Sequence, residues 1–446
     1  MEEVTVIGAG LAGSEAAWQI AGRGVRVSLY EMRPYKMTPA HHSEYFAELV
    51  CSNSFRAVSL QNAVGLLKEE MRQLNSLVIK CAHKSRLPAG GALAVDRDDF
   101  ARGVTDYLLK NPLVDVHYEE IVTIPDARPV IIATGPLTSM GLVRSLESFT
   151  GLGKLYFYDA AAPIVTYESI NRDKAFFASR YEKGGDDYLN CPMNKEEYKL
   201  FWRELVRGEV AESKEFEKEI FFEGCMPVEV LAKRGEDTLR YGPLKPVGIS
   251  VPENGKQPYA VVQLRKDNKE GTLYNMVGFQ TRLKWPEQKR IFRLIPGLER
   301  AQFVRLGVMH RNIFINAPLL LEATLQMKEH PGVFWAGQIT GVEGYVESAA
   351  MGLVAGINAC RFLKSEIPVV FPRETALGAL TNYITTADPQ NFQPMNINFG
   401  LFPLLSTASN KKGRKELLSR RSLEKLSTFQ KIFHLFACII TLTMLI

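Results

Sequence analysis

The chain has 446 residues, which is enough for two or three domains around a large core. A hydrophobic fraction of 46% and a charged fraction of 23% are those of an ordinary soluble globular protein. The net charge of +5 gives little support to a nucleic-acid partner, because residues 404–446 carry eight Lys or Arg against two Glu and the rest of the chain is near neutral.

The cysteines are scattered along the chain, with no C-x-x-C pair among them. This spacing suggests neither a metal site nor a disulfide framework, and it favours a reducing, cytoplasmic setting. The first strand is predicted within three residues of the N-terminus, so no signal peptide is expected. The six positions are Cys51, Cys81, Cys191, Cys225, Cys360 and Cys438.

Residues 4–34 have every part of a dinucleotide-binding βαβ unit in order: strand, glycine turn, helix, strand and acid. Gly8, Gly10 and Gly13 have G-x-G-x-x-G spacing, which permits a tight turn, a close approach of a pyrophosphate and close packing of the helix on the strand. The N-terminus of that helix offers N–H groups to the phosphates. A glycine-rich turn of some other α/β fold is the alternative.

The second strand of this unit is predicted to end at Glu31, about 20 residues beyond the glycines, where a carboxylate accepts ribose hydroxyls. The helix before it is predicted to stop near Gly22. An acid at that distance favours a dinucleotide site. The cofactor-binding residues predicted here are Gly8, Ala9, Gly10, Leu11, Ala12, Gly13 and Glu31.

A long polar stretch with little periodicity follows Glu31 and ends in small polar residues around Cys51. Loops of that length inside a compact domain are usually functional or disordered. A reactive thiol and an inert cysteine in a capped turn both fit these residues. Beyond the loop, an amphipathic helix is predicted over residues 62–80, a helix capped by Asp96 after it, and a buried strand within residues 129–136.

From residue 142 to about 306 the sequence changes to short strands, aromatic residues and turns, which indicates an inserted domain. Asn194 and Glu197 form an N-cap pair that opens a helix. Residues 220–222 are predicted as a strand that leads into a turn at Cys225. A reactive cysteine and a buried one both fit this position.

The chain then returns to its first pattern. Residues 332–344 read as a strand, a glycine turn and a helix start, and residues 348–360 as a small-residue helix. That helix could pack against a flavin or against the first helix, and simple core packing is the alternative. Gly337, Gln338 and Gly344 are the cofactor-binding residues predicted in this part.

Taken together, these residues resemble the folate-dependent, flavin-containing tRNA (uracil-5-)methyltransferases, the TrmFO family, over about residues 1–403. GidA-type flavoproteins share the first unit but not this cysteine arrangement. The motifs that carry the resemblance are GAGLAGSEAAWQ, YEMRP, ELVCSNSFR, GLLKEEMR, PAGGALAVDR, FEGCMPVE, LRYGPLKPVG and AGQITGVEGYVESAAMGL.

The resemblance implies an α/β fold in which a Rossmann-type FAD-binding domain of the two-dinucleotide, GidA-like kind is interrupted by an α+β insertion domain. The first part of the FAD-binding domain is expected over residues 1–141 and the insertion over 142–306. The second part of the FAD-binding domain is expected over residues 307–403, and residues 404–446 form a tail.

The resemblance also implies that a one-carbon unit passes from methylenetetrahydrofolate to C5 of the T-loop uridine of tRNA, with NAD(P)H supplying electrons through FAD. Cys225 matches the nucleophile of the family and Cys51 a second catalytic cysteine. A thiolate is needed because uracil C5 is a poor nucleophile until a thiolate adds to C6. Arg56 and Arg240 are the nearby cations in sequence that could activate a thiol. No metal is expected.

Two other functions stay open at this point. One is an FAD-dependent NAD(P)H oxidoreductase acting on a small metabolite, and the other is a non-catalytic flavin-bound protein that binds tRNA. Past residue 403 the chain is expected to depart from the family. Residues 432–446 are nearly all apolar but shorter than the roughly 20 residues that span a bilayer, so no stable membrane insertion is expected. A packed helix, a membrane contact and an altered reading frame all fit this segment.

Overall fold

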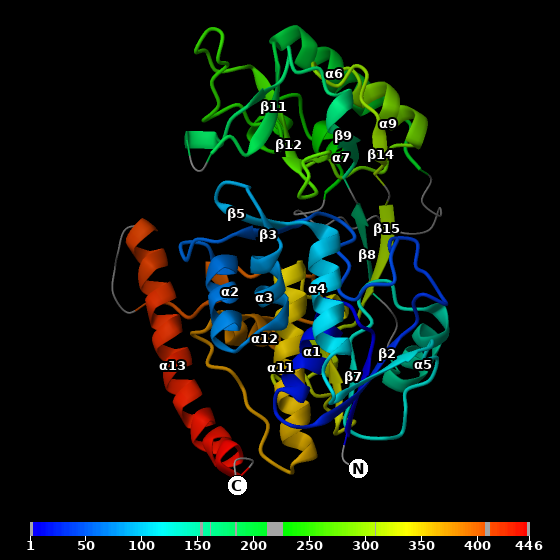
Figure 1. Cartoon of the computed structure of the whole chain (residues 1–446), viewed down its shortest axis with the longest axis vertical. Coiled ribbons are helices and arrows are strands. Elements are labelled where there is room, and N and C mark those ends of the chain that lie inside the picture. Colours follow the sequence, from blue (N-terminus) through cyan, green and yellow to red (C-terminus); the bar gives the residue numbers. More distant parts are fainter. Residues whose placement is uncertain are drawn as a thin grey trace.

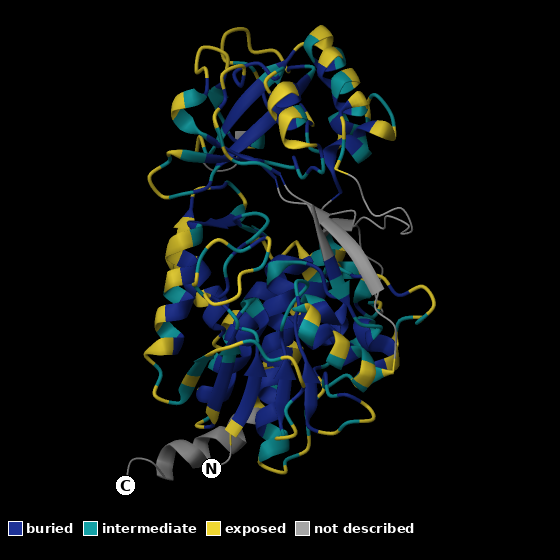
Figure 2. Ribbon diagram, turned by 90° about the vertical axis from the view of Figure 1, so that its right-hand side faces the viewer, coloured by how far each residue is buried: buried dark blue, intermediate teal, exposed yellow. Residues whose placement is uncertain are grey.

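The computed structural model describes residues 3–151, 155–160, 162–182, 185–211, 226–307, 309–405 and 411–443. Two main hydrophobic cores organise these residues, a larger one built from both ends of the chain and a smaller one built from its middle. Figure 1 shows the smaller body, mostly green, above the larger one. Figure 2 shows the buried strands and helices at the centre of each body.

A five-stranded parallel sheet lies at the centre of the larger body. Its strands read as short apolar runs because helices cover both faces of such a sheet. The strands predicted at the glycine turn, before Glu31 and within residues 129–136 are confirmed. In spatial order the strands are β16 (Val333–Trp335), β7 (Val130–Ile132), β1 (Glu3–Ile7), β2 (Arg26–Glu31) and β6 (Val114–Tyr118).

Two helices from opposite ends of the chain pack closely beside this sheet: α1 (Leu11–Ala21) and α11 (Tyr345–Leu363). A Cβ atom added at Gly352 would lie 2.0 Å from the carbonyl oxygen of Ala12. Only glycine allows that approach of the two backbones, so the predicted packing of the small-residue helix against the first helix is confirmed.

By length and composition, α11 is also the one helix among the described residues that could cross a membrane. However, 83% of its apolar window is buried inside the protein. Its apolar character therefore reflects its place in the larger core, where it packs against both α1 and the sheet.

The helix predicted over residues 62–80 is in fact two helices, α2 (Ala63–Gln73) and α3 (Leu77–Lys84). The chain turns between them at Asn75, which has a φ of 59°. Ser76 then caps α3, and its hydroxyl donates to the buried Glu15 at 2.7 Å. Buried apolar residues occur on both sides of the break, from Val64 to Met71 and from Leu77 to Ala82, so the periodicity alone did not reveal the cap.

The remaining helices and strands of the larger body complete its core. Asp96 caps α4 as predicted, because its carboxylate accepts from two N–H groups of the first turn at 3.0 Å. The remaining elements of the larger body are β3 (Ser54–Ala57), β4 (Arg86–Leu87), β5 (Ala92–Val95), α4 (Arg97–Leu109), α5 (Met140–Thr150), α10 (Ala317–Leu320) and α12 (Ala376–Thr386).

The smaller body is a mixed α+β unit around a six-stranded sheet with antiparallel pairs. The Asn194–Glu197 capping box at its first helix is confirmed. The strands, in spatial order, are β10 (Phe176–Phe177), β11 (Tyr188–Met193), β12 (Ala260–Lys266), β13 (Leu273–Met276), β9 (Ile164–Thr166) and β14 (Phe303–Arg305). The helices are α6 (Lys195–Arg207), α7 (Val228–Lys233), α8 (Thr238–Tyr241) and α9 (Trp285–Phe292).

A two-stranded antiparallel ribbon, β8 (Leu155–Ala160) with β15 (Met309–Phe314), joins the two bodies. We propose that the insertion begins and ends on this ribbon. Leu142 and Leu146 of α5 pack in the larger core, which favours a start after α5 rather than at residue 142.

The C-terminal segment forms one long helix, α13 (Lys411–Thr443), which lies along the larger body beside α2 (Figure 1). Leu418 and Leu426 are 2% and 0% exposed and belong to the larger core. The first part of this helix therefore packs on the larger body. The side chains from residue 433 onward fall outside the described part of the chain, so the alternatives given for residues 432–446 stay predictions.

Candidate functional site

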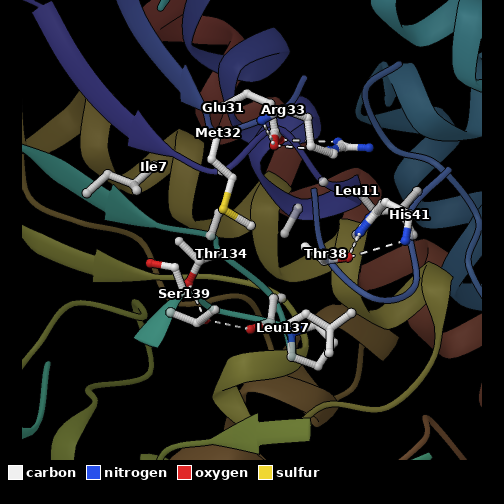
Figure 3. A pocket seen from close by; sticks show the side chains of 18 of the residues that line it. Ile7, Leu11, Glu31, Met32, Arg33, Thr38, His41, Thr134, Leu137 and Ser139 are labelled. Atoms are coloured by element: carbon white, nitrogen blue, oxygen red, sulfur yellow. Dashed lines mark hydrogen bonds and ion pairs between the residues drawn. The ribbon is translucent and has the colours of Figure 1, made fainter. Parts of the chain in front are cut away.

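The glycine turn between β1 and α1 borders the cavity shown in Figure 3. Gly8 has a φ of +96°, and a Cβ atom on Gly13 would lie only 1.7 Å from the Gly8 carbonyl oxygen. At Gly10, in contrast, an added Cβ atom would meet nothing within 4 Å, so its face is open to the cavity. The three glycines thus have three roles: a left-handed turn, an open approach and tight packing of the helix.

Glu31 closes this turn from the end of β2. Its Oε2 accepts from the backbone N–H of Ala9 at 3.0 Å, and its Oε1 pairs with Arg33 Nε at 3.0 Å. Burial raises the pKa of Glu31, but the hydrogen bonds and charge of Arg33 more than offset it and leave the pKa below its usual value. Figure 3 shows this ion pair at one end of the cavity.

The long loop after Glu31 is an ordered wall of the same cavity rather than a disordered segment. Thr38 and His41 are joined by a 2.6 Å hydrogen bond and both line the cavity. Burial and the charge of Arg33 lower the pKa of His41 to about 4, so this ring is neutral at pH 7. Glu48 fixes the loop by accepting from the N–H of Ser43 at 3.0 Å and from its hydroxyl at 2.8 Å.

The cavity is completed by two further glycine turns, one after β7 and one after β16. The strand within residues 129–136 therefore does bring the chain back to the cavity. Gly337 and Gln338 line it as well, but Gly344 does not. The cavity is lined, among others, by Gly8, Gly10, Leu11, Ala12, Glu31, Arg33, Thr38, His41, Val50, Thr134, Gly135, Ser139, Gly337, Gln338, Tyr345 and Ser348.

Gly344 lies instead beside a polar cluster behind the first turn of α11. A Cβ atom on Gly344 would lie 2.5 Å from Glu347 Oε2. Arg56 pairs with Glu347 and donates to Asn396 Oδ1 at 2.8 Å. Arg56, a sequence candidate for activating a thiol, is thus committed to that carboxylate.

Cys51 lies on the loop that meets α11. The backbone N–H groups of Cys51 and Ser52 donate to the hydroxyl of Tyr345 at 2.8 and 3.0 Å. Because Tyr345 also lines the cavity, the Cys51 turn is fixed against the cavity wall. Burial raises the pKa of Tyr345, so its hydroxyl stays protonated at neutral pH.

Cys225 falls outside the described residues, so its predicted role stays a prediction. Arg240, the other sequence candidate, stacks over the ring of Tyr259 at 3.8 Å and pairs with Asp237 at 2.6 Å. The cations that contact the Cys51 turn are instead Arg97, which donates to the carbonyl oxygen of Cys51 at 3.2 Å, and Arg305, which donates to that of Val50.

Sequence reasoning missed Tyr345, Arg97 and Arg305. Tyr345 stands directly after Gly344 at the start of α11, and Arg97 directly after the helix cap Asp96. Both positions follow a recognised turn or cap, and that signal could have identified them. Arg305 has no comparable signal in the sequence, since only the fold brings it to the Cys51 loop. Among the described residues no group of three or more His, Cys, Asp or Glu side chains could hold a metal ion.

Comparison with known proteins identifies the relationships of the chain. The family model for "Glucose inhibited division protein A" matches residues 3–366. A protein of Pelotomaculum thermopropionicum named methylenetetrahydrofolate--tRNA-(uracil-5-)-methyltransferase TrmFO is 63% identical over 429 residues, which cover 96% of this chain and 98% of that protein. A protein of the same name from Exiguobacterium sibiricum is 62% identical over 432 residues, or 96% of this chain and 99% of that protein.

These relatives correct the prediction that the family pattern ends near residue 403. An alignment over 96% of the chain must continue well past that residue, into α13. Packing explains why: Leu418 and Leu426 belong to the larger core, so this stretch is part of the fold even though its surface is basic.

Among solved structures, GidA of Aquifex aeolicus matches with a TM-score of 0.67 at 17% identity and covers 96% of this chain and 78% of its own. A second crystal form of that protein gives a TM-score of 0.66 at 16% identity, over 97% of this chain and 76% of that one. At this identity the likeness concerns the fold, and it confirms the predicted GidA-like, Rossmann-type architecture. With relatives above 60% identity along almost its whole length, the chain belongs to the TrmFO family within the group described as glucose inhibited division protein A.

Proposed function

We propose that this protein transfers a one-carbon unit from methylenetetrahydrofolate to C5 of a uracil in tRNA, the activity named for its relatives. One observation carries the proposal: the hydroxyl of Tyr345, which lines the dinucleotide cavity, also holds the turn that bears Cys51. A thiol and a cofactor site are thereby adjacent, as a reaction that uses both requires. The small-metabolite oxidoreductase receives no support from these relatives.

The cavity fits FAD. The open face of Gly10 leaves room for a pyrophosphate where any side chain would intrude, and the N-terminus of α1 points the same way. Glu31 and Arg33 lie at the ribose end, and the small residues Gly337 and Ser348 line the part of the wall formed by β16 and α11. When bound, FAD would supply the electrons that convert the transferred one-carbon unit into a methyl group.

The chain itself supplies the nucleophile and its position. A thiolate that adds to uracil C6 places electron density on C5, which can then attack the one-carbon unit. We assign this role to Cys225 from the family pattern and a second catalytic role to Cys51. The target base has to leave its stack to reach such a thiol.

Three finer statements belong to the same proposal. The electrons come from NAD(P)H, the target is the T-loop uridine, and the protein works in the cytoplasm, where its tRNA substrate is found. The first two follow from the family pattern in the sequence, and the third follows from the substrate.

The test is transfer of labelled carbon from methylenetetrahydrofolate to an unmodified tRNA transcript with NADH or NADPH present. The wild type should transfer label. Cys51→Ala and Cys225→Ala should each lose more than about 100-fold in rate, because removal of a residue that acts covalently removes most of the catalysis. Cys81→Ala, which removes a buried thiol of the larger core, is the matched control and should retain the rate. A flavin-loaded wild type that transfers no label would overturn the proposal.

A further inference from the structure

The Cys51 turn lies where the two bodies of the protein meet, and side chains from both bodies hold it. This turn, residues 49–53, is called here the Cys51 loop. Arg97 belongs to the larger body, at the first position of α4, whereas Arg265 on β12 and Arg305 on β14 belong to the smaller body. All three arginines donate hydrogen bonds to the Cys51 loop.

The carbonyl oxygens of the loop are bound first. Arg97 donates to the carbonyl oxygen of Leu49 and, at 3.2 Å, to that of Cys51. Arg305 donates to the carbonyl oxygen of Val50, which lies between them. Three consecutive carbonyl groups thus accept from two arginines, one from each body. Hydrogen bonds from a charged donor are about twice as strong as neutral ones.

The side chains at the end of the loop are held from the smaller body as well. Arg265 donates to Asn53 Oδ1 at 2.9 Å and to Ser52 Oγ at 3.2 Å. Asn53, fully buried, donates in turn to the carbonyl oxygen of Lys266 at 2.9 Å. Asp267 is the acid in this group, and it pairs with Arg97 at 3.0 Å across the seam.

Burial makes these contacts hard to replace by water. Arg265 is 6% exposed, and burial lowers the pKa of Arg265 and of Arg305, although both guanidinium groups remain charged. A buried cation without hydrogen-bond acceptors is strongly unfavourable, and the Cys51 loop supplies those acceptors. The loop and the smaller body therefore fix each other.

The N–H groups of the same loop are held by Tyr345, which belongs to the larger body. Tyr345 accepts from the N–H groups of Cys51 and Ser52. These N–H groups belong to the two peptide units whose carbonyl groups accept from Arg305 and Arg97. Cys51 is thus held between α11 at the cavity wall and β14 of the smaller body. A shift of the smaller body would have to move the loop or break the Arg305 contact.

We propose that Arg305, supported by Arg265, is a positioning residue through which the smaller body sets the place of Cys51 beside the cofactor cavity. This inference rests on the proposed catalytic role of Cys51. The smaller body then contributes to the geometry of the active site, because the position of the Cys51 thiol depends on the position of that body relative to the larger one.

The experiment compares Arg305→Ala and Arg305→Met with the wild type in two measurements on the full-length, flavin-loaded protein. The first is the rate at which iodoacetamide alkylates Cys51, followed by mass spectrometry of the peptide that contains it. The second is labelled-carbon transfer to tRNA, resolved into kcat and KM. Met keeps the length and packing of the arginine stem but cannot donate, so it serves where the Ala variant fails to fold.

The control is Arg293→Ala. Arg293 also binds a carbonyl group in the smaller body, donating to Ala301 at 3.0 Å, but it is not at the seam. We expect both Arg305 variants to alkylate Cys51 at least fivefold faster and to lose at least tenfold in kcat, with KM for tRNA within twofold. Arg293→Ala should change neither rate.

An alkylation rate that stays at the wild-type value in an Arg305 variant would overturn the inference. Alkylation does not depend on methyl transfer, so the two proposals fail separately. A wild type that transfers no label would contradict the proposed function, and the alkylation rates would still test the role of Arg305.

Discussion

The backbone N–H of Ala9 donates to Glu31 Oε2 at 3.0 Å, and this bond ties the glycine turn to the end of the neighbouring strand. Arg33 holds the other oxygen of the same carboxylate, also at 3.0 Å. The turn, the acid and the arginine therefore form one unit at the end of the cavity where we propose that the ribose binds, and the charge on Glu31 stabilises this unit.

Glu31→Gln should weaken FAD binding about 10- to 100-fold, the loss expected when one or two hydrogen bonds to a charged group become neutral. Flavin fluorescence during titration of the apoprotein measures this. Glu299→Gln, which removes an ion pair with Lys174 in the smaller body, should leave the affinity unchanged. Since the folded pKa of Glu31 lies below its usual value, its contribution to stability is present above a pH of about 4.3 and is lost as the pH falls.

Gly10→Ala should weaken FAD binding, whereas Gly13→Ala should destabilise the fold. The Gly10 position has open space and a φ of −70°, so Ala is tolerated by the apoprotein and should intrude only on the pyrophosphate. At Gly13 a Cβ atom would lie 1.7 Å from a backbone oxygen, so the fold itself must shift, at a cost of about 1–3 kcal/mol or more. Thermal unfolding of the apoproteins and FAD titration separate the two effects. Equal melting temperatures for the two variants would contradict this account.

Several elements in both bodies could be predicted from the sequence because each has a local signal. The glycine spacing, the acid at Glu31, the cap at Asp96 and the Asn194–Glu197 pair are all set by residues a few positions apart. The break at Asn75 was missed because buried apolar residues continue on both sides of it. Gly344 was assigned to the cavity because it closes the strand, glycine turn and helix-start pattern, whereas the structure places it beside Glu347, Arg56 and Asn396.

The neighbours of Cys51 could not be predicted in the same way. Tyr345, Arg265 and Arg305 lie more than 200 positions from it in the sequence, and only the fold brings them together. Sequence reasoning therefore chose Arg56 and Arg240, which are local to the two cysteines but bind Glu347 and Asp237 instead.

Tyr345→Phe should loosen the Cys51 loop while keeping the aromatic ring. Two backbone N–H groups would lose their acceptor, which costs about 1–3 kcal/mol in stability when they stay buried. Labelled-carbon transfer should fall at least about tenfold, since each 1.4 kcal/mol of misplacement is a factor of about ten in rate. Tyr383→Phe is the matched control, because that hydroxyl bonds to the exposed segment at Gln393. A Tyr345→Phe variant with wild-type transfer would contradict the assignment.

Glu70→Gln should remove a pH dependence of the folding stability that comes from the buried Glu70 carboxyl group between α12 and α13. Glu70 is fully buried, accepts from the N–H groups of Ala376 and Leu377 at the start of α12, and binds the hydroxyl of Ser422 on α13. Burial raises its pKa to about 7, despite these hydrogen bonds. The folded protein thus holds a proton that the unfolded chain releases near a pH of about 4.3, so this group makes the fold less stable as the pH rises from about 4 to about 7.

Melting temperatures of the wild type and of Glu70→Gln, measured from a pH of about 4.5 to about 7.5 so that they cover the window set by that pKa shift, test this prediction. The variant, whose amide stays neutral, should gain stability relative to the wild type as the pH rises. Glu69→Gln changes the adjacent carboxylate, which pairs with Arg72 near the surface, and should not show that gain. Parallel curves for the wild type and Glu70→Gln would mean that Glu70 is ionised throughout the range, and that the amides of α12 compensate its burial fully.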